Sequence, residues 1–340
     1  MKPVSVLVVI VNYRTPVLAL GAAAALEADI AERGDAHVVI VDNGSGDDSA
    51  ATIARGIEER GYGDWCSLLA ETRNGGFAAG NNVGIAWYRH ETGMLPDYAW
   101  LLNPDTIAEP GALGALVDFL RDHPEVGLAG SRCLEPDGTV WPSAFRFQSP
   151  RTELNAAINF GPITRLLGNP VIAPPQPESP ARTDWVSGTS MMVRREVLER
   201  VGPMDEGYFL YFEETDYCAR AAEAGFQSWT VPASRVKHIG GQATGVTGEQ
   251  RAQKRRPRYW FASRARFLIH QYGVGRTHLA NLLWLAGYPL GRLIAGLRGR
   301  KSDDPPRFWR DFLLAYYGPA GIMYAPAKRA RRMGDGKKDD

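Results

Sequence analysis

The feature that most constrains this chain is an apolar run that ends abruptly at residues 103–105. A hydrophobic strand is predicted over residues 98–102, and Asn103, Pro104 and Asp105 follow it. Proline has a fixed φ and no amide hydrogen, so the strand cannot continue past Pro104. In open α/β sheets, ligands bind beyond the carboxyl ends of the strands, which is where Asn103 and Asp105 would lie.

The side chains of Asn103 and Asp105 allow two interpretations. Their oxygen atoms suit a hard divalent cation such as Mg2+ or Mn2+, which in turn would hold a diphosphate. Asn, Pro and Asp are also common turn residues, and the tripeptide alone is explained more simply as a turn. The rest of the chain favours the ligand site.

Length and composition indicate a large α/β protein. With 340 residues, of which 44% are hydrophobic, the chain can bury one large core or two smaller ones. Helix-like and strand-like segments alternate through its first half, as in α/β folds. The three cysteines are far apart in the sequence, which is typical of a reducing compartment. The apolar run at residues 4–11 is too short for a signal peptide or a spanning helix, so a buried strand is expected there.

The net charge of +1 conceals a strong asymmetry. Residues 241–340 contain 20 Lys and Arg against 7 Asp and Glu, a net charge of +13, which leaves −12 on the rest. Such a basic region suggests an anionic partner, either nucleic acid or a membrane surface. No recognised nucleic-acid-binding motif accompanies the charge, so nucleic acid is not expected.

Polar residues also follow the first two predicted strands. The strand at residues 5–11 leads to Asn12 and Arg14, and the strand at residues 37–41 leads to Asp42. This is the layout of a nucleotide site in a doubly wound sheet. Asp42 could accept a hydrogen bond from a ribose hydroxyl or a base, or it could form only a cap or turn.

Two further segments carry possible chemistry. Residues 73–84 are rich in glycine and lead into a predicted helix, which suits an anion but also suits plain packing. Their spacing matches neither the dinucleotide fingerprint nor the P-loop. Between these residues and the second segment, residues 131–184 contain many prolines and are expected to form a long loop region.

The second segment is an acidic helix start. Glu213, Glu214 and Asp216 precede a helix predicted over residues 217–224, where they could simply stabilise the helix dipole. The aromatic residues at 208, 209, 211 and 212 would instead raise a carboxylate's pKa and make it a base.

In combination, these segments resemble the family 2 glycosyltransferases of the GT-A fold, and among them the bacterial rhamnosyltransferases. The motifs that carry the resemblance span about the first 240 residues: V-V-I-V-N-Y-R (8–14), V-D-N-G-S (41–45), R-N-G-G-F-A-A-G-N-N-V-G (73–84), L-L-N-P-D (101–105), W-V-S-G (185–188), Y-F-E-E-T-D-Y (211–217) and H-I-G-G (238–241). The resemblance implies a Rossmann-like, mostly parallel twisted sheet flanked by helices. It also implies an inverting, metal-dependent transferase that uses a nucleotide-diphosphate sugar.

The resemblance also assigns expected roles to residues. Asp105 corresponds to the metal-binding residue of the family's D-x-D motif, with Asn103 in place of the first carboxylate, and His238 corresponds to a histidine ligand of the metal. Glu214 corresponds to the catalytic base, with Asp216 as an alternative. The residues expected to bind the nucleotide sugar are Asn12, Arg14, Asp42, Asn74, Gly80, Asn81, Asn103 and Gly188.

Residues 1–245 are therefore expected to form the catalytic domain, and residues 246–340 a basic, amphipathic helical region. Residues 279–297 are apolar but are interrupted by glycine, proline and arginine, so they make a poor membrane span. Basic clusters beside aromatic segments suit an anionic membrane surface. A helical C-terminal subdomain packed on the sheet explains Leu282, Leu283 and Trp284 equally well.

The expected function is transfer of a deoxysugar, rhamnose from dTDP-rhamnose, to a lipid-linked glycan in cell-surface polysaccharide assembly. The expected location is the cytoplasm, at the inner face of the plasma membrane. Two alternatives stay open: a UDP-hexose transferase of the same fold, and a non-catalytic nucleotide-sugar-binding component of an assembly complex.

Overall fold

The computed structural model describes residues 5–239, 255–300 and 304–324, and the chain divides into two compact units. The first unit comprises residues 1–147 and 173–248, and the second comprises residues 148–172 and 249–340. The expected boundary at residue 245 lies near the end of the first unit. Residues 148–172, however, belong to the second unit and not to the expected catalytic domain.

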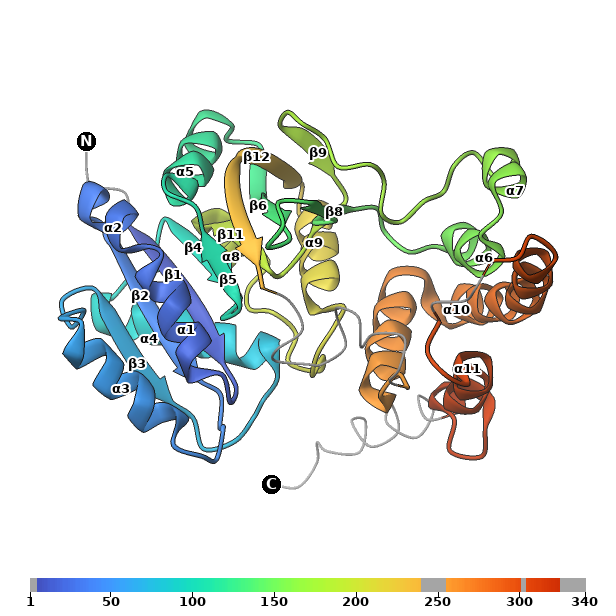
Figure 1. Ribbon diagram of the computed structural model, residues 1–340, viewed down its shortest axis with the longest axis horizontal. Coiled ribbons are helices and arrows are strands. Elements are labelled where there is room, and N and C mark those ends of the chain that lie inside the picture. The colour runs from blue at the N-terminus through green and yellow to red at the C-terminus, as the bar shows by residue number, and fades with distance from the viewer. Residues whose placement is uncertain (1–4, 240–254, 301–303, 325–340) are drawn as a thin grey trace, which may run out of the picture. The chain divides into compact units, whose positions relative to one another are not determined.

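The first unit is a mixed sheet with helices on both faces (Figure 1). Its strands are β1 (Val6–Asn12), β2 (Ala36–Asp42), β3 (Cys66–Ala70), β4 (Tyr98–Leu102), β5 (Thr106–Ala108), β6 (Val126–Leu134), β7 (Val140–Trp141), β8 (Ala144–Phe145), β9 (Ala181–Thr183), β10 (Trp185–Val186), β11 (Ser190–Arg194) and β12 (Gln227–His238). Its helices are α1 (Pro16–Ala24), α2 (Glu27–Arg33), α3 (Ser49–Glu59), α4 (Phe77–Thr92), α5 (Ala112–Asp122), α8 (Arg195–Arg200) and α9 (Glu213–Glu223).

The strand order of the large sheet is β3-β2-β1-β4-β11-β6-β12-β5, with β7 beside β6 and β9 beside β12. Strands β3, β2, β1 and β4 are parallel to one another, and β12 is parallel to β6. Strand β11 is antiparallel to both of its neighbours, β4 and β6. The predicted Rossmann-like α/β class is confirmed.

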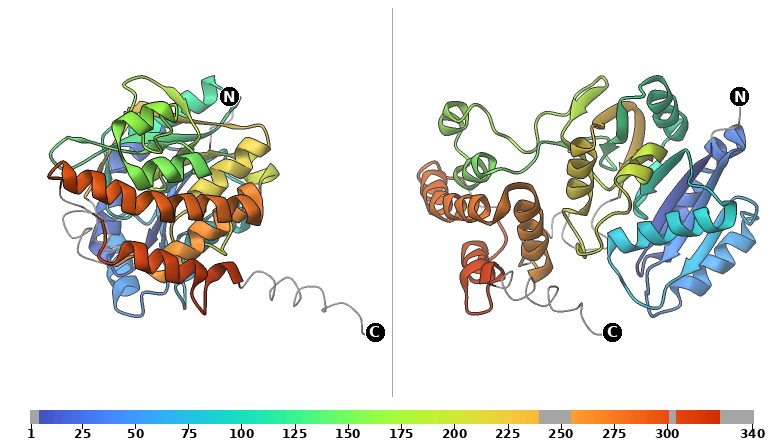
Figure 2. Two further views of the ribbon diagram at one scale, coloured as in Figure 1. Left: turned by 90° about the vertical axis from the view of Figure 1, so that its right-hand side faces the viewer. Right: turned by 180° about the vertical axis from the view of Figure 1, so that it is seen from behind.

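Strand β1 is buried on both faces, and its alternate residues contribute to two separate cores. Val6, Val8 and Ile10 pack with residues of α1, α3 and α5. Leu7 and Val9 pack with residues of α4, α8 and α9 on the other side. Figures 1 and 2 show α1 on one face of the sheet and α4 on the opposite face.

Helix α4 lies unusually close to the sheet because small residues face the strands. A Cβ atom added to Gly84 would come within 2.8 Å of Val9 and 3.0 Å of Val39. The helix also begins earlier than predicted, at Phe77 inside the glycine-rich segment. The amino end of α4 therefore reaches the carboxyl ends of β1 and β2.

The predicted loop region at residues 131–184 is wrong in part. It contains β7, β8 and β9 and two helices, α6 (Pro150–Ile158) and α7 (Gly161–Leu166). Of the prolines that suggested a loop, Pro162 lies in the first turn of α7, where a missing amide hydrogen costs nothing. Ser149 and Thr152 close the start of α6 with a reciprocal capping box.

The second unit consists of α6, α7, α10 (Arg258–Leu297), α11 (Phe308–Tyr317) and the short 3-10 helix η2 (Ile322–Tyr324). Helix α10 bends at Gly273, whose φ of 74° is not helical, and Figure 2 shows its two segments running in different directions. Its core contains Ala157, Phe261, Ala265, Trp284, Phe312, Tyr316 and Met323. The helices of this unit thus pack on one another, while packing of the unit on the sheet stays a prediction.

Two polar groups inside the second unit, the Arg264 guanidinium and the Leu285 carbonyl, have partners from other helices. The buried guanidinium of Arg264 lies 2.7 Å from a Glu153 carboxylate oxygen and donates a hydrogen bond of 2.7 Å to Asn281. Pro289 cannot donate to the carbonyl of Leu285 one turn earlier, and the Trp309 indole donates to that carbonyl instead, at 2.9 Å. None of the helices in the described ranges is both long and apolar enough to cross a bilayer.

The contact between α6 and α10 provides a stability test. A Cβ atom on Gly291 would lie 2.4 Å from the carbonyl oxygen of Ala157 and 2.6 Å from that of Ile158, and neither backbone atom can move cheaply. We expect Gly291→Ala to destabilise the protein by about 1–3 kcal/mol through overpacking. Thermal unfolding followed by circular dichroism measures this.

Gly296 in the same helix is the matched control, because nothing lies within 4 Å of its added Cβ. Gly296→Ala should be neutral or stabilise the protein by up to about 1 kcal/mol, as expected from helix propensity. Equal melting temperatures for the two variants would show that α6 does not pack on α10 as described.

Candidate active site

The polar residues that follow the strands meet at one edge of the sheet. Strands β1, β2 and β4 are parallel and end at Asn12, Asp42 and Leu102. Strands β6 and β4 are both antiparallel to β11, and β12 is parallel to β6, so β12 runs in the same direction as β4. His238 at the end of β12 therefore lies at this same edge.

The ends of β1 and β2 are joined by a buried hydrogen-bond network. The Asn12 amide donates to Asp42 at 2.7 Å, and the Ser45 hydroxyl donates to the same carboxylate oxygen at 2.5 Å. Asn12 in turn accepts from the backbone and hydroxyl of Thr15. Asp42 thus makes contacts within the turn, which was one of the two roles that the sequence allowed for it. Asn12 and Asp42 fix the shape of this part of the edge.

Arg14 follows the network with an exposed side chain. Its backbone is left-handed, with φ of 59°, and its amide donates to the Ser45 hydroxyl at 2.9 Å. Its Nε donates to the Ser45 carbonyl, also at 2.9 Å. Because Ser45 bonds to both Arg14 and Asp42, it organises the loop after β1. The sequence analysis did not single out Ser45, although it stands within the V-D-N-G-S motif.

The glycine-rich segment is tied to the end of β2 through Asn43. The Asn43 amide donates to Asn74 at 3.2 Å and to the Gly76 carbonyl at 2.9 Å, and its oxygen accepts from the Gly75 amide. Asn74 accepts from the Gly76 amide at 2.9 Å. Asn74 therefore lies at the predicted edge, and Asn43 is a second organising residue that the sequence analysis did not select.

Gly80 and Asn81 lie in the packing between α4 and the sheet. A Cβ atom on Gly80 would come within 2.6 Å of Val11, so a larger residue would push the helix away. Asn81 is fully buried, and its amide donates to the Phe77 carbonyl at 2.9 Å. Both were predicted to lie near the diphosphate or sugar. We assign them instead to the close contact that positions the glycine-rich loop.

Asp105 and His238 meet through the pairing of β5 with the end of β12. In this antiparallel pair His238 is opposite Thr106, and the Ile239 amide donates to the Asp105 carbonyl at 2.9 Å. The His238 Nε2 lies 3.3 Å from Asp105 Oδ1, and both side chains are buried. The two residues predicted as metal ligands are therefore brought together.

The donor set at this point is small. Asp105 and His238 offer one carboxylate and one imidazole, and the partly buried Asn103 precedes Asp105 by two residues. The residues that the structure describes contain no group of three His, Cys, Asp or Glu side chains able to hold a metal. A cation here would need further oxygen ligands, which a bound diphosphate could provide.

Glu213 and Glu214 occupy the start of α9, directly after Tyr211 and Phe212. These two aromatic residues have left-handed backbones, with φ of 69° and 71°, a strained conformation that is often found at functional sites. Burial raises the pKa of Glu214, opposed by backbone N–H groups that include that of Gly188. One oxygen of Glu214, Oε2, is buried and has no hydrogen-bond partner among the residues that the structure describes.

Glu213 is even more deeply buried, at 3% exposed, and burial together with the nearby charge of Glu214 holds its pKa well above the ordinary value. Gly188 lies between Phe77 and Glu214, and an added Cβ would come within 3.2 Å and 3.8 Å of them. Gly188 lies two residues before Ser190, the first residue of β11, and Ser190 is opposite Leu102 at the end of β4. Glu214 is therefore at the same sheet edge as Asp105 and His238.

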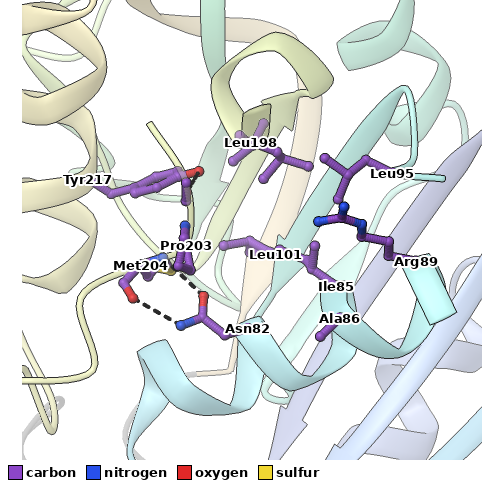
Figure 3. A pocket seen from close by; sticks show the side chains of 12 residues that line it. Asn82, Ile85, Ala86, Arg89, Leu95, Leu101, Leu198, Pro203, Met204 and Tyr217 are labelled. Atoms are coloured by element: carbon purple, nitrogen blue, oxygen red, sulfur yellow. Dashed lines mark hydrogen bonds between the residues drawn. The ribbon is translucent and has the colours of Figure 1, made fainter. Parts of the chain in front are cut away.

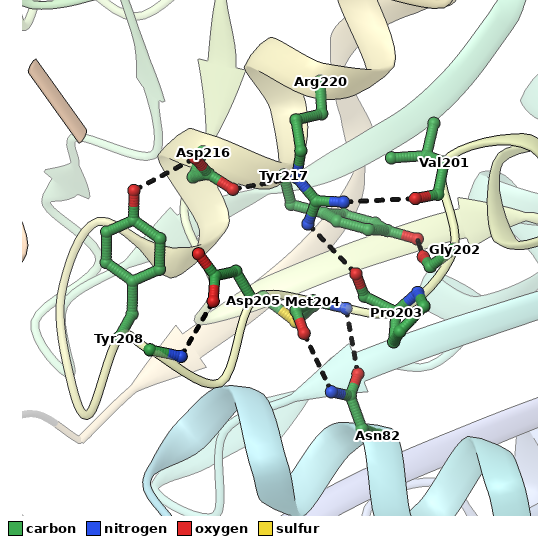
Figure 4. Close-up of polar contacts among 11 residues, drawn as sticks. Asn82, Val201, Gly202, Pro203, Met204, Asp205, Tyr208, Asp216, Tyr217 and Arg220 are labelled. Atoms are coloured by element: carbon green, nitrogen blue, oxygen red, sulfur yellow. Dashed lines mark hydrogen bonds and ion pairs between the residues drawn. The ribbon is translucent and has the colours of Figure 1, made fainter. Parts of the chain in front are cut away.

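Asp216, the alternative base, is fully engaged in structural contacts (Figure 4). It accepts from the Tyr208 hydroxyl at 3.0 Å and from Arg220 Nε at 2.9 Å, and it is only 1% exposed. Arg220 also donates to the carbonyls of Val201 and Pro203. Asp216 thus anchors the loop that leads into α9, and Glu214 is the better candidate for the base.

The same loop is fixed from its other side by Asn82 of α4. The Asn82 amide donates to the Met204 carbonyl at 2.9 Å, and its oxygen accepts from the Met204 amide at 3.0 Å. Beside these two hydrogen bonds lies a pocket of about 230 Å³ between α4, α8 and α9 (Figure 3). None of the predicted site residues lines this pocket, so we do not assign the sugar nucleotide to it.

The sequence matches a known enzyme family over most of its length. Residues 3–266 match the family described as "Glycosyltransferase like family 2". The chain is 31% identical over 219 residues to the N-acetylglucosaminyl-diphospho-decaprenol L-rhamnosyltransferase of Mycobacterium tuberculosis (strain H37Rv), covering 61% of this chain and 68% of the relative. It is 26% identical over 166 residues to rhamnosyltransferase WbbL of Escherichia coli (strain K12), covering 48% of this chain and 60% of the relative.

Two solved structures share the fold. The mannosyltransferase PcManGT of Pyrobaculum calidifontis, in complex with GDP-Man and Mn2+, aligns with a TM-score of 0.52 and 20% identity over 96% of this chain and 83% of its own. GalNAc-T7 with UDP, GalNAc and Mn2+ aligns with a TM-score of 0.55 and 13% identity over 94% of this chain and 58% of its own. At these identities the likeness concerns the fold alone. The chain belongs to the family 2 glycosyltransferases, as a rhamnosyltransferase-like member with a GT-A fold.

Proposed function

We propose that this protein is an inverting glycosyltransferase that moves rhamnose from dTDP-rhamnose onto a lipid-linked glycan. The observation that carries the proposal is the buried, unpaired oxygen of Glu214 at the sheet edge that also holds Asp105 and His238. Each predicted site residue belongs to the first unit, so catalysis is assigned to that unit, residues 1–147 and 173–248. The basic C-terminal region belongs to the second unit, together with residues 148–172.

In this mechanism Glu214 is the general base. As the acceptor oxygen attacks the anomeric carbon, its proton moves to the Glu214 carboxylate. The bond to the nucleoside diphosphate breaks on the opposite face of the sugar, so the anomeric configuration inverts. The raised pKa of Glu214 gives it a greater affinity for that proton than an ordinary glutamate has.

The other residues of the edge hold the donor. The Asn12–Asp42 network and the loop fixed by Asn43 and Asn74 give the nucleotide a rigid surface, and this orientation lowers the entropic barrier. The exposed guanidinium of Arg14 can contact a phosphate. Asp105 and His238 would hold a divalent cation, which as a Lewis acid neutralises the leaving diphosphate.

The names of the relatives support the donor and the acceptor class. Two of them are rhamnosyltransferases, and the mycobacterial one is named for an acceptor linked to decaprenol through a diphosphate. An acceptor of that kind lies in a bilayer, and this supports the proposal that the protein works in the cytoplasm at the inner face of the plasma membrane. A UDP-hexose donor is the second candidate, because the two structural neighbours were solved with GDP-Man and with UDP. A non-catalytic role is disfavoured by the presence of Asp105, Glu214 and His238 together.

A donor panel tests the proposal directly. Purified protein is incubated with a polyprenyl-diphosphate-linked acceptor and, in turn, dTDP-rhamnose, UDP-glucose, UDP-N-acetylglucosamine and GDP-mannose. We expect release of dTDP from dTDP-rhamnose with a glycosylated lipid product. Turnover of a UDP-sugar alone would establish the second candidate, and absence of turnover with every donor would support the non-catalytic component.

The role of Glu214 predicts a specific loss of turnover. Glu214→Gln keeps the shape of the side chain but removes the proton acceptor, so kcat should fall by about 10²–10⁴-fold while donor binding survives. The base must be ionised, and its pKa is raised. Wild-type activity should therefore fall as the pH is lowered through a pKa above that of an ordinary glutamate. The residual activity of the variant should not show this acidic decrease.

Glu213→Gln is the matched control, with the same chemical change one residue earlier. It should keep turnover and raise the melting temperature. Because the pKa of Glu213 is raised in the folded state, its ionisation costs stability as the pH rises above the ordinary glutamate value. The gain from the substitution should thus grow with pH. If Asp216→Asn abolished transfer and Glu214→Gln did not, the base would be Asp216.

The proposed metal site at Asp105 and His238 predicts a loss of metal stimulation. Asp105→Ala should abolish stimulation by Mg2+ or Mn2+, and His238→Ala should weaken it, because each removes one of the two buried donors. Activity is measured at increasing Mn2+ after treatment with EDTA. Full activity in excess EDTA would exclude a metal-dependent reaction, and a normal Mn2+ response in Asp105→Ala would move the site elsewhere.

A further inference from the structure

The segment of α10 after Gly273 carries an exposed stripe of leucines. We define the leucine stripe as Leu279, Leu282, Ala286, Leu290, Leu293 and Leu297. These residues recur every three or four positions and so share one face of the helix. The five leucines are between 45% and 81% exposed, which is unusual for so many large apolar side chains on one helix.

The opposite face of the same segment is already used for packing. Trp284 stacks on Phe312 of α11, with ring centroids 4.0 Å apart. Gly287 and Gly291 face α6, where an added Cβ would meet Leu154, Ala157 and Ile158. The segment thus has two apolar faces, and the core of the second unit contains only one of them.

Basic side chains predominate around the leucine stripe, although Asp304 lies 3.8 Å from Arg292 and accepts a hydrogen bond from Tyr288. Helix α10, from Arg258 to Leu297, contains no aspartate or glutamate. Arg276 lies near the start of the stripe, and Arg298 and Arg300 lie just beyond its end; all three are exposed. Apolar residues flanked mainly by basic side chains suit the interface of an anionic lipid bilayer, which is apolar inside and anionic at its surface.

We propose that the leucine stripe is the surface by which the second unit lies on an anionic lipid bilayer. This rests on the proposed function, since a lipid-linked acceptor must be met at the membrane. From Leu279 to Leu297 the helix is about 27 Å long, and it would lie in the plane of the interface rather than span it. Arg276, Arg298 and Arg300 would contact lipid phosphates at the two ends. A second copy of the chain is a poorer partner because it would bring further positive charge to these ends.

The test is binding of the full-length protein to vesicles of phosphatidylcholine with or without about 30% phosphatidylglycerol, measured by flotation. The triple variant Leu282→Gln/Leu290→Gln/Leu293→Gln keeps the charge and the helix propensity of the stripe. At about 0.5 M salt, where surface attraction is strongly screened, we expect the wild type to stay bound to the anionic vesicles. The triple variant should bind at least about tenfold more weakly, because burial of its apolar side chains is lost.

Val17→Gln/Met94→Gln is the matched control, since these two apolar residues of the first unit are 73% and 53% exposed. It should bind vesicles like the wild type. Equal binding of the triple variant and the wild type at high salt would overturn the proposal. So would a melting temperature lowered only in the triple variant, which would mean that the stripe packs within the protein. Vesicle-free self-association that the triple variant abolishes would assign the stripe to a second copy.

Transfer to a water-soluble acceptor with a short lipid chain separates this proposal from the proposed function. The triple variant should retain wild-type turnover with that acceptor, because none of its substituted residues belongs to the catalytic unit. Loss of vesicle binding with normal turnover would support the stripe. Normal vesicle binding without turnover by the wild type would refute the proposed function and leave the stripe intact.

Discussion

Strand β1 pairs in parallel with β2 on one side and with β4 on the other, and it is buried on both faces. The two helical layers and the catalytic edge all depend on this arrangement. Because three neighbouring strands run in the same direction, Asn12, Asp42 and the Asn103–Asp105 segment emerge together. The close approach of α4, which Gly80 and Gly84 permit, then brings the glycine-rich loop to the same place. The candidate site is thus a consequence of strand direction and of helix-to-sheet distance.

The start of α9 combines unfavourable features around Glu214, the base in the proposed mechanism. Tyr211 and Phe212 are consecutive left-handed residues, and Oε2 of Glu213 is buried without a hydrogen-bond partner in the described part of the chain. Contacts elsewhere in the loop compensate for this cost. Arg220 joins Asp216 to two backbone carbonyls, and Asn82 binds both backbone groups of Met204. Arg220 and Asn82 thus hold the loop from two sides, which stabilises its strained conformation.

The second unit solves a different problem, because its helices must hide apolar residues while remaining strongly basic. The buried Arg264 is neutralised by Glu153 and lies over the rings of Phe312 and Tyr316, so it supports the core. Among the described residues, Arg276, Arg298 and Arg300 carry positive charge on exposed side chains. The bend at Gly273 separates a segment that packs through Phe261 from one that carries an apolar face on each side. That division explains how one helix can serve both the core and an external surface.

The sequence by itself determined the α/β class, the strands that end in polar residues and the likeness to family 2 glycosyltransferases, because these depend on local patterns. Even so, Pro162 was interpreted as a loop signal, since a proline at the first turn of a helix resembles one in a turn. Only the tertiary structure decided that His238 lies against Asp105 and that Asp216 is engaged by its neighbours. Periodicity likewise could not tell which apolar face of α10 is buried. Each of these outcomes depends on contacts between residues far apart in the chain, and local sequence patterns do not specify such contacts.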